Sequence, residues 1–146
     1  MMTFETHSPQ ETFDIAKKMG EEAKVGTVIT LDGDLGAGKT LFTKGFAAGL
    51  GITEPVSSPT FTILQEYSGG RFPLYHFDVY RIGDPMEMEE IGFDDFIYGD
   101  GVCLIEWSEL IAELIPDDAV KIRIERSPQM GDDYRRINIW EKSEKS

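Results

Sequence analysis

The chain has a single cysteine, few basic residues and no long apolar run. Of its 146 residues, 14 are Lys or Arg and 27 are Asp or Glu, which gives a formal net charge of −13 at pH 7. This charge argues against binding to nucleic acid or to an anionic lipid surface that is driven mainly by electrostatics, because Lys and Arg drive such binding. It leaves room for a small basic patch and suits a protein that docks on a basic partner surface.

Cysteine usage and hydropathy indicate a cellular compartment. The lone Cys103 has no second cysteine with which to form an internal disulfide, which favours an intracellular protein. The sequence opens with no basic and apolar signal, and no apolar run is long enough to span a bilayer. We therefore expect a cytoplasmic protein, and the length predicts one domain over residues 1–146.

A glycine-rich run near the middle of the N-terminal half carries the strongest signal. Gly33-Asp34-Leu35-Gly36-Ala37-Gly38-Lys39-Thr40 fits the phosphate-loop pattern G-x-x-x-x-G-K-[ST] at every fixed position. An apolar run over 28–31 precedes it, and a helical stretch over 41–50 follows. Such a turn exposes backbone N–H groups to an anion at a helix N-terminus. Lys39 is then placed to reach the β- and γ-phosphates of a nucleotide, and the Thr40 hydroxyl to ligate Mg²⁺.

The remaining pattern predicts an α/β fold of the P-loop NTPase kind, a three-layer sandwich with a mixed central sheet and flanking helices. Ser8 and Glu11 form a capping box that opens a helix to about Gly20. Gly49 and Gly51 supply the stop of the helix after the phosphate loop. Strands are expected over 27–32, 63–67, 74–80, 102–105, 120–126 and 135–140, and further helices over 84–91, 94–98 and 109–115.

Two acidic residues are candidates to complete a Mg²⁺ site beside the phosphate loop. Glu106 follows the most apolar strand of the C-terminal half, at the end where such folds bind ligands. Asp78 interrupts an aromatic strand, where an acid needs a partner. The alternatives are an ion pair between Asp78 and Arg81, and a solvated strand end for Glu106.

Three other residues have a functional and a plain interpretation. The segment over 57–60 follows the phosphate-loop helix, where nucleotide hydrolases often carry a switch, and Thr60 is its best candidate contact. The plain alternative is a proline-rich turn with capping hydroxyls. Trp107 either covers the nucleotide or a partner surface, or belongs to the core. His76 is better explained as a satisfied sheet histidine than as a catalytic base.

Four separate segments together resemble the bacterial TsaE (YjeE) family, in order and in spacing. They are the phosphate loop, Ser58-Pro59-Thr60-Phe61, Tyr75-His76-Phe77-Asp78-Val79-Tyr80-Arg81 and Glu106-Trp107. The resemblance covers the chain from about Ser8 to Trp140. Two positions depart from the family. Leu41 stands where many relatives have a second Thr, and Ser108 stands where relatives often have Pro.

The resemblance implies a small ATPase that is weakly active alone and acts on the TsaD–TsaB pair. That pair installs the threonylcarbamoyl group on the adenosine beside the anticodon of tRNAs that read codons beginning with A. The resemblance also implies that the ATPase resets the complex between turnovers. A protein with a net charge of −13 is a poor tRNA binder on its own, so we expect contact with tRNA to go through the partners.

The family's residue roles carry over position by position. Lys39 and the loop backbone from Gly33 to Leu41 would hold the phosphates, and Thr40 and Glu106 would hold Mg²⁺. Asp78 and Thr60 would act near the attacking water or sense the γ-phosphate. Trp107 would lie at the nucleotide or partner face, and the first-helix hydroxyl of Thr12 would border the adenine.

Two rival functions share the phosphate loop. A small-molecule kinase would need an acceptor pocket and usually an Arg-bearing lid, but the expected helix over 85–91 is acidic. A non-catalytic, nucleotide-gated binding module would bind ATP and ADP without needing Asp78 or Glu106 for its function.

Overall fold

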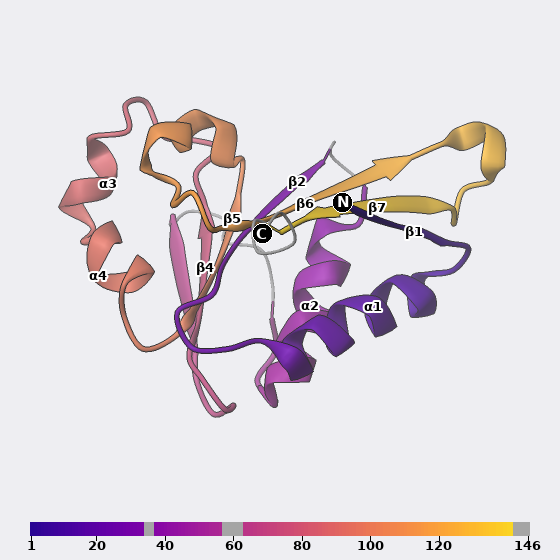
Figure 1. The fold of residues 1–146 in the computed structure, drawn as a ribbon, viewed down its shortest axis with the longest axis horizontal. Coiled ribbons are helices and arrows are strands. Elements are labelled where there is room, and N and C mark those ends of the chain that lie inside the picture. Colours follow the sequence, from indigo (N-terminus) through magenta and orange to yellow (C-terminus); the bar gives the residue numbers. More distant parts are fainter. Residues whose placement is uncertain (34–36, 57–62, 142–146) are drawn as a thin grey trace.

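The fold is organised around one mixed β-sheet (Figure 1). The computed structural model describes residues 1–33, 37–56 and 63–141. Within these residues seven strands pair in the order β1-β7-β6-β2-β5-β4-β3. Strands β6, β2, β5 and β4 are parallel, whereas β1–β7, β6–β7 and β3–β4 are antiparallel. The strands are β1 Met2–Thr6, β2 Val28–Gly33, β3 Leu64–Tyr67, β4 Leu74–Asp78, β5 Val102–Glu106, β6 Val120–Arg126 and β7 Arg135–Trp140. The predicted α/β fold with a mixed sheet and flanking helices is confirmed.

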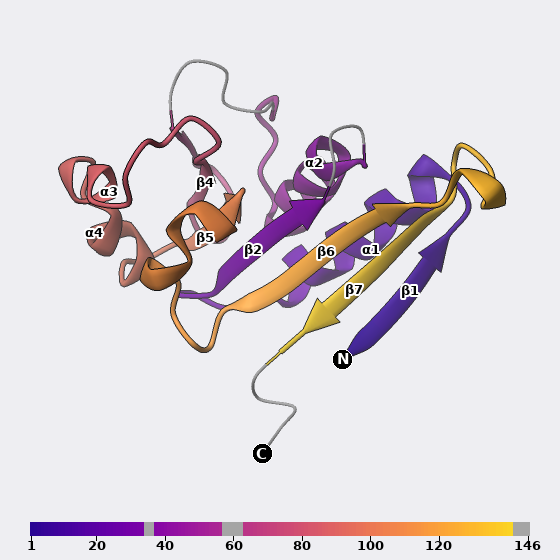
Figure 2. The same ribbon diagram turned by 90° about the horizontal axis from the view of Figure 1, so that it is seen from above.

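Helices cover the two faces of the sheet unequally. Helices α1 (Pro9–Glu22) and α2 (Lys39–Leu50) lie on one face, and α3 (Glu87–Glu90), α4 (Phe93–Ile97) and the 3₁₀ segment η1 (Ser108–Leu114) lie on the other. This second group covers the β2, β5 and β4 side, so the described chain leaves that face bare over β6, β7 and β1 (Figure 2). A short 3₁₀ turn, η2 (Pro128–Met130), lies between β6 and β7. No described helix combines the length and the apolar character needed to cross a bilayer.

The central parallel strands are buried on both faces, which is why they read as continuous apolar runs. In β5, Val102 and Leu104 belong to the core beneath α1 and α2, while Cys103 and Ile105 belong to the core beneath α3, α4 and η1. All four residues are at most 1% exposed. Since burial of each such side chain stabilises the fold by about 1.5–3 kcal/mol, β5 is anchored from both sides.

Glycines allow α1 and α2 to approach each other closely. A Cβ placed on Gly49 would lie 2.0 Å from the carbonyl oxygen of Lys17, and one on Gly45 would lie 2.5 Å from that of Phe13. The prediction that Gly49 helps to end α2 is therefore wrong, because Gly49 lies inside the helix at the crossing. Gly51, at φ 89°, is the left-handed residue that ends α2.

The capping box at the start of α1 forms as predicted. The Ser8 hydroxyl accepts from the Glu11 N–H at 3.2 Å. The Glu11 carboxylate reaches back to the N–H of His7, one residue earlier than Ser8, at 2.7 Å. The far end of α1 is held by Arg71, whose guanidinium donates to carbonyl oxygens of the last turn, among them that of Gly20 at 2.8 Å.

Strand β1 and segment η1 differ most from the sequence-based expectation. Strand β1 was not predicted, because four of its five residues are exposed and its hydrogen bonds go to β7 at the other end of the chain. The expected helix over 109–115 is a 3₁₀ segment, interrupted at Ile111 by a φ of −130°. That stretch is too short to be a stable helix on its own, and the Ile111 side chain is fully buried in the second core.

The helix crossing generates a stability prediction. Gly49→Ala should lower the free energy of unfolding by about 1–3 kcal/mol, because the new methyl group overlaps the α1 backbone. This loss should outweigh the better helix propensity of Ala. Lys44→Ala, an exposed position on the same helix, is the matched control and should change stability by less than about 0.5 kcal/mol. Denaturant unfolding measures both, and equal midpoints for the two variants would contradict the close approach.

Candidate functional site

The candidate site lies where parallel strands β2, β5 and β4 end at one edge of the sheet. The pairing places Leu31 beside Glu106 on one side, and Asp78 beside Glu106 on the other. Helix α2 begins at the same edge, since it follows β2 through the phosphate loop. Four residues singled out from separate parts of the sequence, Lys39, Asp78, Glu106 and Trp107, are thereby brought together.

Both described ends of the phosphate loop depend on glycine. Gly38 precedes α2 at φ 105°, a left-handed conformation that favours glycine. Gly33 lies against β6, where a Cβ would come within 2.5 Å of the Ile124 carbonyl oxygen. The carbonyl oxygen of Ala37 accepts from Arg135 Nε at 2.8 Å, which ties the loop to β7. Asp34, Leu35 and Gly36, also predicted to bind phosphate, lie outside the described residues.

Lys39 points at the carboxylate of the last residue of β5 and at the aromatic ring of the next residue. Its Nζ is 3.8 Å from Glu106 Oε1 and 4.5 Å from the centre of the Trp107 ring. Lys39 is 8% exposed and Glu106 is 3% exposed, so their charges face each other with little water between them. Thr40 and Leu41 follow in the first turn of α2; Thr40 is exposed and Leu41 is half-buried.

Glu106 has a second partner that the sequence did not indicate. Its Oε2 is 2.6 Å from Nε2 of His76, a fully buried residue of β4. His76 and Asp78 are two residues apart on one strand and therefore share a face of the sheet. This spacing is the only sequence signal that links His76 to the acidic pair.

Asp78 is half-buried at the end of β4, and its pKa is raised. Burial is the largest cause, and the nearby Glu106 carboxylate adds to it; the N–H of Tyr80, at 3.1 Å from Asp78 Oδ1, and the positive Lys39 act in the opposite direction. The alternative of an ion pair with Arg81 is not formed in the described part of the chain. A carboxylate with a raised pKa is better suited to accept a proton near neutral pH.

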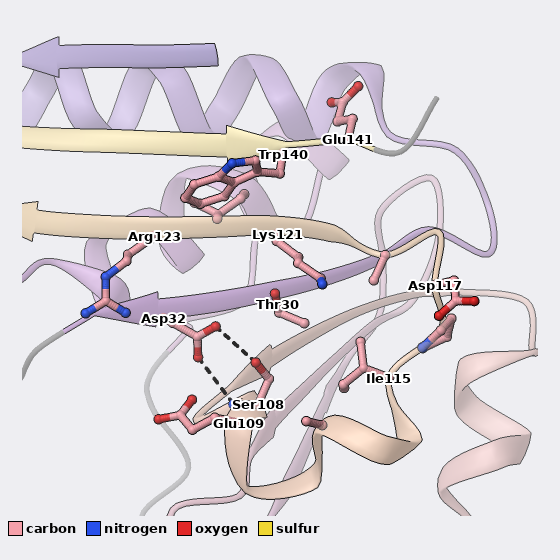
Figure 3. Close-up of a pocket in the computed structure, with 14 residues that line it drawn as sticks. Thr30, Asp32, Ser108, Glu109, Ile115, Asp117, Lys121, Arg123, Trp140 and Glu141 are labelled. Carbon is pink, nitrogen blue, oxygen red and sulfur yellow. Dashed lines mark hydrogen bonds between the residues drawn. The ribbon is translucent and has the colours of Figure 1, made fainter. Parts of the chain in front are cut away.

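A hydrogen-bonded turn holds Trp107 in place. Trp107 is the only described non-glycine residue with a positive φ, 61°, a conformation that costs roughly 1–2 kcal/mol. The next residue, Ser108, donates to Asp32 from both its N–H (3.2 Å) and its hydroxyl (3.0 Å), as Figure 3 shows. Proline at this place would have neither donor. The ring of Trp107 also packs against that of Tyr80, with centroids 4.8 Å apart.

A groove of about 790 Å³ runs from this turn along the bare sheet face (Figure 3). Asp32 and Glu109 lie at one end, Lys121 and Arg123 of β6 project into it, and Trp140 lines its far side. Asp32, Glu109 and Arg123 also line a smaller cavity of about 70 Å³ that contains Lys39 and Trp107. The groove therefore borders the cavity beside Lys39.

The oxygen-rich donor set fits Mg²⁺ bound together with a phosphate. Among the described residues no group of three or more His, Cys, Asp and Glu could hold a metal ion by itself. Mg²⁺ is usually held by one or two protein oxygens and completed by substrate phosphates and water. The Glu106 carboxylate, 3.8 Å from Lys39, and the hydroxyl of Thr40, the residue after Lys39, have this chemistry.

One described residue that was predicted for the site, Thr12, has no described contact with this cluster. Thr12 is 1% exposed in α1, and its hydroxyl shares a 2.7 Å hydrogen bond with that of Thr6. No described contact joins it to Lys39, so its place beside the adenine stays a prediction. Thr60 lies outside the described residues.

Sequence reasoning missed several residues that shape the site. Asp32 had a usable signal, since it is an acid at the end of a buried strand, as Glu106 is. Arg135 and Arg123 had none, because their place beside the phosphate loop follows from the pairing of β6 and β7 with the rest of the sheet.

Comparison with known proteins gives a consistent result. The family model described as "Threonylcarbamoyl adenosine biosynthesis protein TsaE" matches residues 6–137. The Bacillus subtilis tRNA threonylcarbamoyladenosine biosynthesis protein TsaE is 54% identical over 138 residues, which cover 94% of this chain and 84% of that protein. The Treponema pallidum protein of the same name is 44% identical over 119 residues, 82% of this chain and 87% of that protein. The crystal structure of Bacillus subtilis YdiB superposes with a TM-score of 0.81 at 49% identity, over 94% of this chain and 83% of that chain.

The Asp32–Ser108 contact predicts how Trp107 is held. Asp32→Ala should leave the two Ser108 donors without their acceptor, lower the free energy of unfolding by about 1–3 kcal/mol, and release Trp107 from its left-handed conformation. The chain has two Trp residues, so the Trp140→Phe background isolates the emission of Trp107. Asp117→Ala, on the exposed wall of the same groove, should leave that emission unchanged. Identical spectra for both variants would show that Asp32 does not hold the turn.

The raised pKa of Asp78 predicts a pH-dependent gain of stability on its neutralisation. Asp78→Asn keeps an acceptor for Tyr80 and removes a charge that burial disfavours, so the variant should be more stable than the wild type near neutral pH. Because the folded protein takes up this proton at a higher pH than the unfolded chain, the gain should shrink as the pH falls toward the ordinary Asp value. Unfolding of both proteins between pH 4 and 8 measures it. The exposed Asp118→Asn is the control, and a gain that grows toward acid pH would reverse the assignment.

Proposed function

Because the chain belongs to the TsaE family of threonylcarbamoyl adenosine biosynthesis proteins, we propose that it binds ATP at its phosphate loop and hydrolyses it weakly. In this proposal it acts in tRNA threonylcarbamoyladenosine biosynthesis on the TsaD–TsaB pair. ATP binding and hydrolysis reset that complex between turnovers. The main support for this proposal is that Lys39, Glu106 and Asp78 lie close together at the start of α2.

Phosphate binding rests on Lys39 and on the start of α2. The unpaired N–H groups of a helix N-terminus favour a negative group. Lys39, whose Nζ lies 3.8 Å from Glu106, binds the β- and γ-phosphates in this proposal. The backbone from Gly33 to Leu41 surrounds them, and Trp107 covers the site.

Hydrolysis rests on the two carboxylates. Thr40 and Glu106 hold Mg²⁺, which when bound neutralises charge that develops on the transferred phosphoryl group. Asp78, next to Glu106 across the strand pair, orients the attacking water and accepts its proton, and its raised pKa supports this role. Thr60 acts beside the γ-phosphate.

Contact with tRNA goes through the partners in this proposal. A net charge of −13 opposes direct binding to a polyanion, because such binding depends on the neutralisation of phosphates by Lys and Arg. A small-molecule kinase and a nucleotide-gated binding module remain the rival functions, and measurement of where the γ-phosphate goes separates them.

The first test compares ATP binding by the wild type and Lys39→Ala. The variant should bind ATP about 10- to 100-fold more weakly, because it loses a charge-assisted contact with the phosphates. Lys44→Ala, exposed five residues further along α2, controls for the loss of one positive charge and should bind as the wild type does. Isothermal titration calorimetry measures the affinities. Unchanged affinity in Lys39→Ala would overturn the phosphate-loop assignment.

Phosphate release from ATP, measured alone and with the TsaD–TsaB pair, then tests the reaction. A low rate that rises with the pair supports a partner-gated ATPase. ATP binding without stimulated release favours the binding module, and transfer of phosphate to an added small acceptor favours the kinase.

A further inference from the structure

His76 is a buried polar residue that directly contacts the acid of the candidate site. It is 0% exposed, and its Nε2 is 2.6 Å from Oε2 of Glu106. The strand register pairs His76 with Leu104 and Asp78 with Glu106, so the Glu106 side chain reaches back along β4 to make this contact. A buried carboxylate needs such partners, because its desolvation is otherwise costly.

The other ring nitrogen indicates the direction of this hydrogen bond. Nδ1 of His76 is buried and has no hydrogen-bond partner in the described part of the structure. A proton on Nδ1 would be a buried donor without an acceptor, which is more costly than an unused lone pair in apolar surroundings. The ring therefore carries its proton on Nε2 and donates it to the carboxylate, which can only accept.

Because of this bond, the two carboxylate oxygens of Glu106 have different partners. Oε2 of Glu106 is occupied by His76, and Oε1 is the atom that lies 3.8 Å from Lys39 Nζ. The terminal torsion of a Glu side chain is soft, so Glu106 would rotate more freely without a donor on one oxygen.

We propose that His76 is a positioning residue, which donates to Glu106 Oε2 and thereby keeps Oε1 directed at the phosphate and Mg²⁺ position. The link to Mg²⁺ rests on the proposed function, whereas the hydrogen bond and its direction do not. Partners of this kind, one step removed from a metal, typically change metal affinity by about 10- to 100-fold when they are removed.

The hydrogen bond is tested first, by nitrogen-15 NMR of the histidine rings in the nucleotide-free protein. The chain has two histidines, and His7→Asn, at an exposed position, identifies the His76 signals. The expected result is a ring with its proton on Nε2, whose signals move in Glu106→Gln and stay in place in Asp94→Asn, an exposed control. A proton on Nδ1, or signals that do not respond to Glu106→Gln, would overturn the proposal whether or not the protein binds ATP.

The positioning role is tested by the Mg²⁺ concentration that gives half-maximal tightening of ATP binding. His76→Leu, which removes the donor, should raise this concentration about 10- to 100-fold while the affinity for ATP in EDTA stays within a factor of two to three of the wild type. His76→Gln retains an N–H donor and should recover most of the Mg²⁺ response. Equal losses with and without Mg²⁺ in both variants would make His76 a core residue only.

Two further measurements keep the outcomes distinct. If His76→Leu does not fold, the comparison is made between His76→Gln and Glu106→Gln, and a Mg²⁺ response in His76→Gln no better than in Glu106→Gln overturns the role. If the wild type binds no ATP, the proposed function fails, and the ring signals alone decide whether His76 donates to Glu106.

Discussion

The buried carboxylate of Glu106 is the constraint on which the rest of the site depends. It is 3% exposed at the end of a strand whose other residues form the centre of both cores. A charge in such a place must be balanced by neighbours. His76 and Lys39 supply that balance from β4 and α2. The carboxylate thus joins the middle of the sheet to the first residue of the phosphate-loop helix.

The position of α2 is fixed from the opposite end by its packing on α1. Gly20, Gly45 and Gly49 let the two backbones approach within a distance that no side chain would permit. Gly33 similarly lets the start of the loop lie against β6, and Arg135 ties Ala37 to β7. The N-terminus of α2 is therefore placed by contacts with α1, β6 and β7 as well as by β5. These contacts hold the backbone of Lys39 within reach of Glu106.

The sequence was sufficient for the parts of the fold that carry their own local pattern. The strand before the phosphate loop and the helix after it, the capping box at Ser8, and the last two strands over 120–126 and 135–140 were all predicted with correct or nearly correct bounds. Strand β1 and the interrupted η1 segment were not, because pairing with β7 and burial of Ile111 decide them.

The same distinction holds within the site. Glu106 and Asp78 could be found as acids at strand ends, whereas His76 and Arg135 depend on which strands are neighbours. His76 was interpreted as a satisfied sheet histidine, but one of its nitrogens has no described partner and the other contacts Glu106.

The acidic residues at the ends of the parallel strands are not in their most stable arrangement. Burial raises the pKa of both Asp32 and Asp78, and each of them lies near a second acid. Strands β2 and β5 beneath are buried on both faces, and this packing holds the unfavourable grouping together with the left-handed Trp107. A site on a mobile loop would instead relax by moving its carboxylates apart into water, and would lose the alignment that phosphate chemistry requires.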